Sequence, residues 1–170
     1  MKNFSLAMVA VASVAAFAQD TKPQVDELTA LKTEVARLKG VVPDQAHAMA
    51  DVGQHFTNLW FAGQSENWPL AQFFLDETKS HLRWAVRIIP KRKDAEGREI
   101  DLQAILTALE TSTLKDLDAT IKEKSRANFE AKYKSQLEGC MSCHKASNKP
   151  YLRLRLPEKA DSAVLEFRPE

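Results

Sequence analysis

Apolar residues recur at steps of three and four positions along most of the chain, which is the spacing of one face of an α-helix. Five segments have this pattern, at residues 25–39, 44–62, 68–89, 102–121 and 125–149. Gly40 and Pro43 follow the first segment, Pro90 stops the third, and Pro150 ends the last. The pattern predicts an all-α fold, with a kink or break of the fourth segment at residues 111–113.

Each of the longer segments is expected to bury one stripe of side chains. For residues 44–62 the stripe is Ala46, Met49, Gly53, Phe56, Trp60 and Gly63. For residues 68–89 it is Leu70, Phe73, Phe74, Glu77, His81, Trp84 and Ile88. For residues 125–149 it is Phe129, Tyr133, Leu137, Cys140 and His144, which span an arc of roughly 80° on a helix. Residues 91–99 are expected to be a polar loop, and residues 151–156 an extended segment that lies over the domain.

The last of these stripes carries Cys140-Met141-Ser142-Cys143-His144, which has the C-x-x-C-H spacing of c-type haem attachment. On a helix the two thiols and the imidazole emerge on neighbouring turns, so one haem face can meet all three. A dithiol redox pair is typical of a βαβ context, and a structural zinc site requires a second close pair of Cys or His ligands. The sequence contains two cysteines and no such pair. The motif therefore predicts one covalently bound haem c.

The N-terminus has the features of a secretory signal peptide at residues 1–18. Lys2 precedes an uncharged apolar run that ends in the small-x-small pattern Ala16-Phe17-Ala18. The run is shorter than the roughly 20 apolar residues that cross a membrane, so we expect cleavage after Ala18, export to the periplasm and no membrane span in the mature protein. Lys2 is the only charge in this leader, so the rest of the chain carries 23 basic and 23 acidic residues, a balance that gives no indication of nucleic-acid binding.

Four amphipathic helices with C-x-x-C-H on the last one resemble the cytochrome c prime family of four-helix-bundle monohaem cytochromes. The resemblance covers residues 43–149 and implies thioether bonds from Cys140 and Cys143 and proximal ligation of the haem iron by His144. Two parts depart from the family pattern, an amphipathic helical arm at residues 19–42 and an extended tail at residues 150–170. The arm either packs on the domain or pairs two chains, and the family's tendency to dimerise makes a homodimer one expectation.

The resemblance also implies that function depends on the sixth position of the iron. A methionine on the first bundle helix gives a low-spin electron carrier, and Met49 is the counterpart, with His55 as the alternative ligand. We expect electron transfer with periplasmic redox partner proteins and no catalytic residues. The alternative is a five-coordinate haem protein that binds or senses nitric oxide or carbon monoxide. A peroxidase-like enzyme would need a distal base such as His55 or His81.

Several of the remaining polar residues have two interpretations. His81 and Glu77 form either a polar site near the haem or a hydrogen-bonded pair in the core. Arg153 and Arg155 follow the motif, with Lys145 and Lys149, and could pair with the anionic haem propionates. The rival interpretation of these cations is a docking surface for an acidic redox partner.

Overall fold

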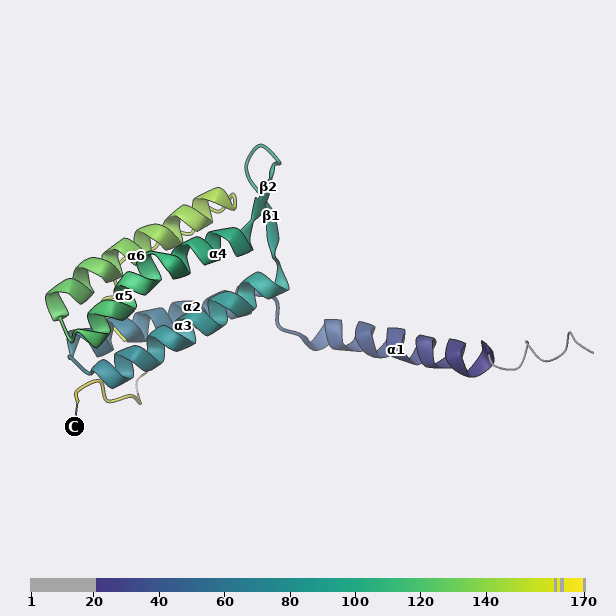
Figure 1. The fold of residues 1–170 in the computed structure, drawn as a ribbon, viewed down its shortest axis with the longest axis horizontal. Helices are drawn as coiled ribbons and strands as arrows, with labels where there is room; N and C mark the ends of the chain where they lie inside the picture. The colour runs from purple at the N-terminus through teal and green to yellow at the C-terminus, as the bar shows by residue number, and fades with distance from the viewer. Residues whose placement is uncertain (1–20, 161, 163, 170) are drawn as a thin grey trace, which may run out of the picture. The chain divides into compact units, whose positions relative to one another are not determined.

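The computed structural model describes residues 21–160, 162 and 164–169, so the predicted signal peptide at residues 1–18 lies outside the described residues. Six helices and two short strands make up this part of the chain (Figure 1). In chain order they are α1 (Thr21–Val41), α2 (Gln45–Gln64), α3 (Trp68–Ile88), β1 (Lys91–Lys93), β2 (Glu99–Asp101), α4 (Leu102–Thr111), α5 (Thr113–Lys122) and α6 (Arg126–Ala146). The predominantly helical structure agrees with the predicted all-α class, and the expected break at residues 111–113 separates α4 from α5.

The chain divides into two compact units, residues 1–42 and residues 43–170. In the first unit the described element is α1, an amphipathic helix whose apolar residues are exposed. These residues are Val25, Leu28, Leu31, Val35 and Leu38. None of the helices in residues 21–160 combines the length and the apolar character needed to cross a bilayer.

Local signals explain where the helices of the second unit begin and end. Asp44, Asn67 and Asp101 are the N-cap residues of α2, α3 and α4, and each side chain accepts a hydrogen bond from the backbone N–H three residues later. Tight turns close two of the connections, because Glu66 and Lys124 adopt positive φ values of 56° and 53°. These short turns bring α2 beside α3 and α5 beside α6.

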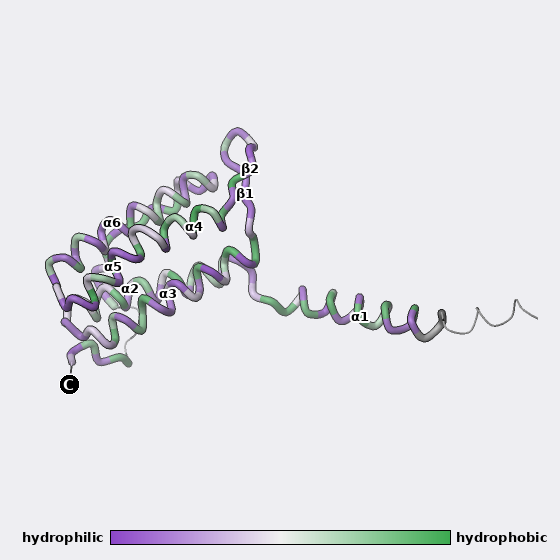
Figure 2. The backbone as a smooth tube through the Cα atoms, in the orientation of Figure 1, coloured by the Kyte–Doolittle hydropathy of each residue, from purple (hydrophilic) through white to green (hydrophobic). Residues whose placement is uncertain are grey.

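The helices of the second unit pack around one main hydrophobic core. Helix α6 packs against α2, α4 and α5, and α3 packs against α2, α4 and α5. The core holds Phe56, Leu59, Ala62, Trp68, Ala71, Phe74, Leu75, Leu114, Leu117, Ile121, Phe129 and Tyr133. Figure 2 shows hydrophobic and hydrophilic residues interleaved along these helices, as amphipathic packing requires.

Two of the expected features are wrong in detail. Residues 91–101 form an antiparallel hairpin, in which Lys91 pairs with Asp101 and Lys93 with Glu99, where a polar loop was expected. On α2 the expected stripe is confirmed at Phe56 and Gly63, which are buried, but Ala46 and Gly53 are exposed and Met49 is half-buried. The buried residues of α2 and α3 include the alanines Ala48, Ala62, Ala71 and Ala85, and the two helices pack against each other.

On α3 the buried face differs from the expected stripe in the same way. Phe73 is 53% exposed, and Glu77, His81 and Trp84 are half-buried at the margin of the face. The fully buried positions are Trp68, Ala71, Phe74, Leu75, Thr78, Ala85 and Val86. Because apolar residues occupy two adjacent faces of this helix, the sequence pattern could not distinguish them.

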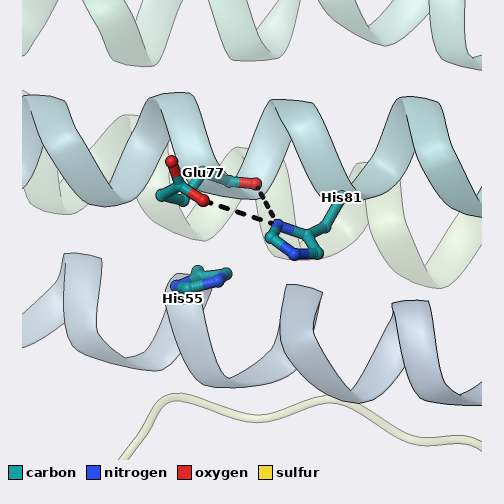
Figure 3. Close-up of side chains that lie close together, drawn as sticks. All are labelled: His55, Glu77 and His81. Atoms are coloured by element: carbon teal, nitrogen blue, oxygen red, sulfur yellow. Dashed lines mark hydrogen bonds and ion pairs between the residues drawn. The ribbon is translucent and has the colours of Figure 1, made fainter.

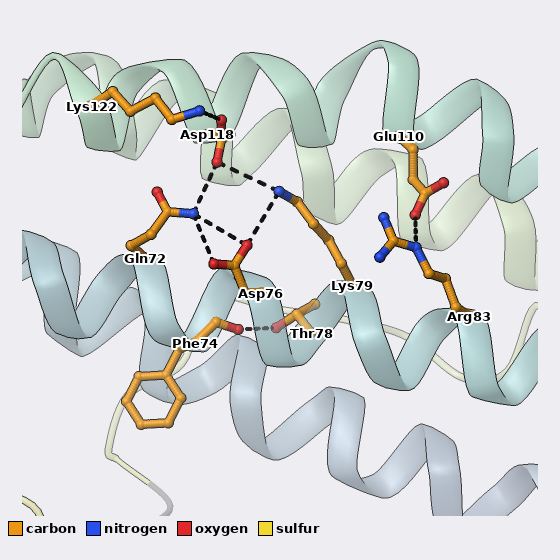
Figure 4. A network of polar contacts seen from close by, with 9 residues as sticks. All are labelled: Gln72, Phe74, Asp76, Thr78, Lys79, Arg83, Glu110, Asp118 and Lys122. Atoms are coloured by element: carbon orange, nitrogen blue, oxygen red, sulfur yellow. Dashed lines mark hydrogen bonds and ion pairs between the residues drawn. The ribbon is translucent and has the colours of Figure 1, made fainter.

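Polar side chains join α3 to α4 and α5 (Figure 4). Asp118 of α5 accepts hydrogen bonds from Gln72 at 3.0 Å and from Lys79 at 3.5 Å, and it also pairs with Lys122. Burial raises the pKa of the Asp118 carboxyl, but the hydrogen bonds from Lys122 and Gln72 and the charge of Lys79 outweigh it, so the pKa lies below its ordinary value. The carboxylate form therefore stabilises the contact between α3 and α5.

The closest approach of α2 to α6 is at Gly63. A Cβ at this position would lie 2.2 Å from the ring of Phe129. We expect Gly63→Ala to lower the free energy of unfolding by about 1–3 kcal/mol, the usual effect of overpacking a core. Gly53→Ala is the matched control on the same helix, because a Cβ at position 53 would contact no other atom within 4 Å. It should raise stability by about 0.5–1 kcal/mol. Urea unfolding of the two variants measures both effects.

Replacing Asp118 tests the polar network. A carboxyl with a lowered folded pKa contributes stability above its unfolded pKa of about 4, and this contribution disappears as the pH falls through the folded value. We expect Asp118→Asn to lower the free energy of unfolding by about 1 kcal/mol at pH 7 and by much less at pH 3. Asp116→Asn on the same helix breaks an exposed pair with Lys132 and should have a smaller effect. Equal losses at both pH values would contradict the expectation.

Candidate functional site

The C-x-x-C-H motif occupies the last two turns of α6, which ends at Ala146. The chain then reverses through Asn148, whose φ of 56° is in the left-handed region. The tail returns along the helix it has just left, and the backbone N–H of Leu154 donates to Met141 Sδ at 3.2 Å. Further along, Leu156 and Phe167 pack against the main core. The tail thereby covers one side of the motif.

Cys140 faces the interior of the helical layer. Its sulfur accepts a hydrogen bond from Gln136 Nε2 at 3.4 Å, and Gln136 in turn accepts one from the hydroxyl of Thr113. Burial raises the pKa of the Cys140 thiol to about 11, and burial also raises the pKa of Cys143. Both cysteines are free thiols. Reactive redox dithiols have lowered pKa values, so this environment does not suit a dithiol oxidoreductase.

Cys143 lies against a second, smaller group of buried residues. This group consists of Val86 of α3 and Leu102 and Leu106 of α4, with Cys143 and three other partly buried neighbours around it. The main core contains twelve buried residues and this one contains three. In Figure 1 the ribbons of α4 and α6 run apart from those of α2 and α3 toward this end of the unit. The apolar packing is therefore thinnest next to the motif.

The imidazole of His144 is held by the returning tail. Its Nδ1 lies 3.3 Å from the backbone oxygen of Leu152. A carbonyl oxygen can only accept, so in the neutral ring the proton is on Nδ1 and the lone pair is on Nε2. This arrangement, with Nδ1–H directed at a backbone carbonyl, is the usual way in which a protein orients a histidine that ligates a metal through Nε2.

The two predicted distal ligands lie in different surroundings on α2. Met49 is half-buried. His55 lies against α3, where its ring is 4.8 Å from that of His81 and 6.1 Å from that of Phe74 (Figure 3). Burial lowers the pKa of His55, and the nearby His81 lowers it further. His47 of the same helix is exposed and contacts the N-cap residue Asp44.

The remaining candidate residues do not all converge on the motif. Arg153 and Arg155 are exposed on the tail, and Arg155 forms an exposed ion pair with Glu158 at 3.1 Å. Glu77 and His81 lie together beside His55. Among the described residues these three form the one group of metal-ligating side chains, so the two cysteines do not belong to an assembled zinc site.

Sequence reasoning missed two features of the region. The Gln136–Thr113 pair beneath Cys140 gave no signal, because the two residues come from different helices. Asp51 lies beside His81 at 3.7 Å, and its signal was its position four residues before His55, which is the same spacing as Glu77 before His81.

Comparison of the chain with protein-family models, with curated proteins and with solved structures found no match. Assignment of a function therefore depends on the residues of this chain alone.

Proposed function

We propose that this protein is a periplasmic c-type cytochrome that transfers electrons through one covalently bound haem. The observation that carries the proposal is the C-x-x-C-H motif at the end of α6, with two unpaired thiols and an imidazole oriented through Nδ1. Cys140 and Cys143 would form the thioether bonds, and His144 would ligate iron through Nε2. When bound, the haem supplies a metal that takes up and returns a single electron.

The surroundings of the motif support this proposal. Val86, Leu102 and Leu106 form a small apolar group against Cys143, where a flat apolar cofactor would find a hydrophobic wall. Leu152 holds the imidazole ring through its carbonyl. In the proposed function these residues exclude water from the iron and fix the ring, and both effects set the reduction potential.

The helix arrangement is compatible with the four-helix bundle of the cytochrome c prime family, with α4 and α5 together as one of the four members. We propose this finer description because α2, α3, α4–α5 and α6 surround a common core and the motif lies at the end of the last helix. Met49 of α2 is the proposed sixth ligand. Arg153 and Arg155 remain proposed partners of the haem propionates, and soluble periplasmic redox proteins remain the proposed donors and acceptors.

The absorption spectrum of the holoprotein tests the proposal. The full chain is produced in a bacterium that attaches c-type haem, and spectra are recorded in both oxidation states with and without carbon monoxide. We expect haem that resists extraction by acidic acetone, with low-spin bands that carbon monoxide leaves unchanged. Met49→Ala should convert the iron to high spin because the ligand is lost.

Three variants make the spectral result specific. Cys140→Ala with Cys143→Ala should abolish covalent attachment. Met141→Leu is the matched control for Met49, because it removes a second methionine sulfur and should leave the low-spin spectrum intact. A high-spin spectrum of the unaltered protein that shifts on addition of carbon monoxide would contradict electron transfer and favour gas binding. Conversion to high spin by His55→Ala alone would assign the sixth position to His55.

We also propose that α1 joins two copies of the chain in a parallel coiled coil. Four of its exposed apolar residues fall on heptad positions a (Leu28 and Val35) and d (Leu31 and Leu38), and Val25 and Val41 fall on the flanking positions e and g. A β-branched residue at a with leucine at d favours two parallel strands. A stripe of this kind exposed on a helix is the usual mark of an interaction surface.

Charge complementarity supports a second copy as the proposed occupant of this stripe. With Leu28 at position a, Glu27 and Glu34 occupy g, and Lys32 and Lys39 occupy e. In a parallel dimer each g residue faces the e residue five positions later in the other chain. Glu27 would then face Lys32 of a second copy, and Glu34 would face Lys39, so both pairs are attractive.

Sedimentation velocity over a range of protein concentrations tests the pairing. We expect a concentration-dependent dimer that the double variant Leu31→Glu with Leu38→Glu converts to a monomer, because the charges would lie in the apolar seam. Thr33→Glu is the control, since position f points away from the seam and the dimer should persist. A monomer at every concentration would contradict the proposal and favour packing of α1 on its own domain.

A further inference from the structure

Helices α2 and α3 carry matching pairs of acidic residue and histidine. Asp51 and His55 are four residues apart on α2, and Glu77 and His81 are four residues apart on α3. Residues at this spacing share one helix face. The two helices are joined by a short turn and pack along each other, so the two pairs meet in opposite order between them. We call Asp51, His55, Glu77 and His81 the histidine–carboxylate cluster.

The ligand atoms of this cluster converge on one point. Atoms from His55, Glu77 and His81 all lie within 4.8 Å of one another, and Figure 3 shows the two rings facing each other across the space between the helices. Asp51 Oδ2 is 3.7 Å from His81 Nε2. A tetrahedral ion with bonds of about 2.0–2.2 Å needs ligand atoms about 3.3–3.6 Å apart. Glu77, whose side chain is 36% exposed, can close this difference by a change of rotamer.

His81 is oriented as a ligand. Its Nδ1 lies 2.9 Å from the backbone oxygen of Glu77, so in the neutral ring Nδ1 carries the proton. Its Nε2 then presents a lone pair on the side where Asp51 lies. A backbone carbonyl that fixes the tautomer of a histidine is the outer-shell arrangement found around bound metals.

The environment of His55 also indicates a ligand, independently of the distances between the side chains. Its Nδ1 is buried and has no hydrogen-bond partner in the described part of the chain. Buried polar atoms of folded proteins are almost always paired, because an unpaired one loses the hydrogen bonds that water would give it. A bound cation accepts the lone pair of this nitrogen and removes that loss.

We propose that the histidine–carboxylate cluster binds a divalent transition-metal ion of the zinc type. His55, Glu77 and His81 are the ligands, and Asp51 is the fourth. Two imidazoles with carboxylates suit zinc and its neighbours in the first transition row, whereas magnesium and calcium prefer oxygen ligands alone. Ligands from two helices would brace α2 against α3. The cluster lies between these two helices, and none of its four residues belongs to the C-x-x-C-H motif, which is on α6.

Calorimetric titration of the chelator-treated holoprotein with zinc chloride tests this inference. We expect one saturable site per chain, and magnesium chloride under the same conditions should give no binding heat. His81→Ala should weaken zinc binding at least tenfold, and Glu77→Gln should weaken it in the same direction. His47→Ala is the matched control, since this exposed histidine is on the same helix as His55 and its loss should leave the affinity unchanged.

The variants also distinguish loss of the metal site from misfolding of the protein and from zinc binding at other residues. Glu77→Gln alters only a half-exposed side chain and keeps its size, so circular dichroism should show an unchanged helix content. Absence of a saturable zinc site would overturn the inference. Zinc affinity that is unchanged in both His81→Ala and Glu77→Gln would also overturn it, because the metal would then be held by other groups, such as the cysteines of a chain without haem.

Discussion

The close contact between α2 and α6 is the constraint on which the rest of the second unit depends. Gly63 leaves room for the ring of Phe129 at a distance that no other residue would allow. Two turns earlier on α2 and one turn later on α6, the ring of Phe56 stacks on that of Tyr133 with 4.2 Å between centroids, and the Tyr133 hydroxyl donates to the Phe56 carbonyl at 2.8 Å. These contacts fix the axial position of α6 and therefore the position of the motif at its end.

The two candidate sites share α3 as a common support. Val86 on its last turns belongs to the apolar group against Cys143. His81 and Glu77, five and nine residues earlier, lie beside His55 of α2. Different parts of α3 thus have different roles. Its C-terminal end provides apolar packing next to the motif, and its middle provides polar side chains beside α2. Asp118 and its partners hold the remaining face of α3 to α5, which keeps the helix from rotating between these roles.

The regular elements of the fold could be predicted from local patterns. Proline and glycine mark several helix boundaries, and aspartate is a residue type that favours helix starts, as at Asp101, whose carboxylate accepts the Ala104 N–H at 3.0 Å. The β1–β2 hairpin could not be predicted, because each strand has three residues, too few to establish an alternating pattern, and β1 is entirely polar. It depends on a turn in which Asp94 accepts backbone N–H bonds from Glu96 and Arg98, and in which Gly97 adopts a φ of 83°.

The sequence by itself determined the helical segments, their breaks and the C-x-x-C-H motif, because each is encoded in residues that are near one another along the chain. It also placed Glu77 and His81 on one helix face, since a spacing of four residues is a local property. Only the tertiary structure decided which face of α2 turned inward and brought His55 to His81. The reason is that this pairing joins residues on separate helices, and its register follows from how α2 and α3 pack against each other rather than from any repeat in the chain.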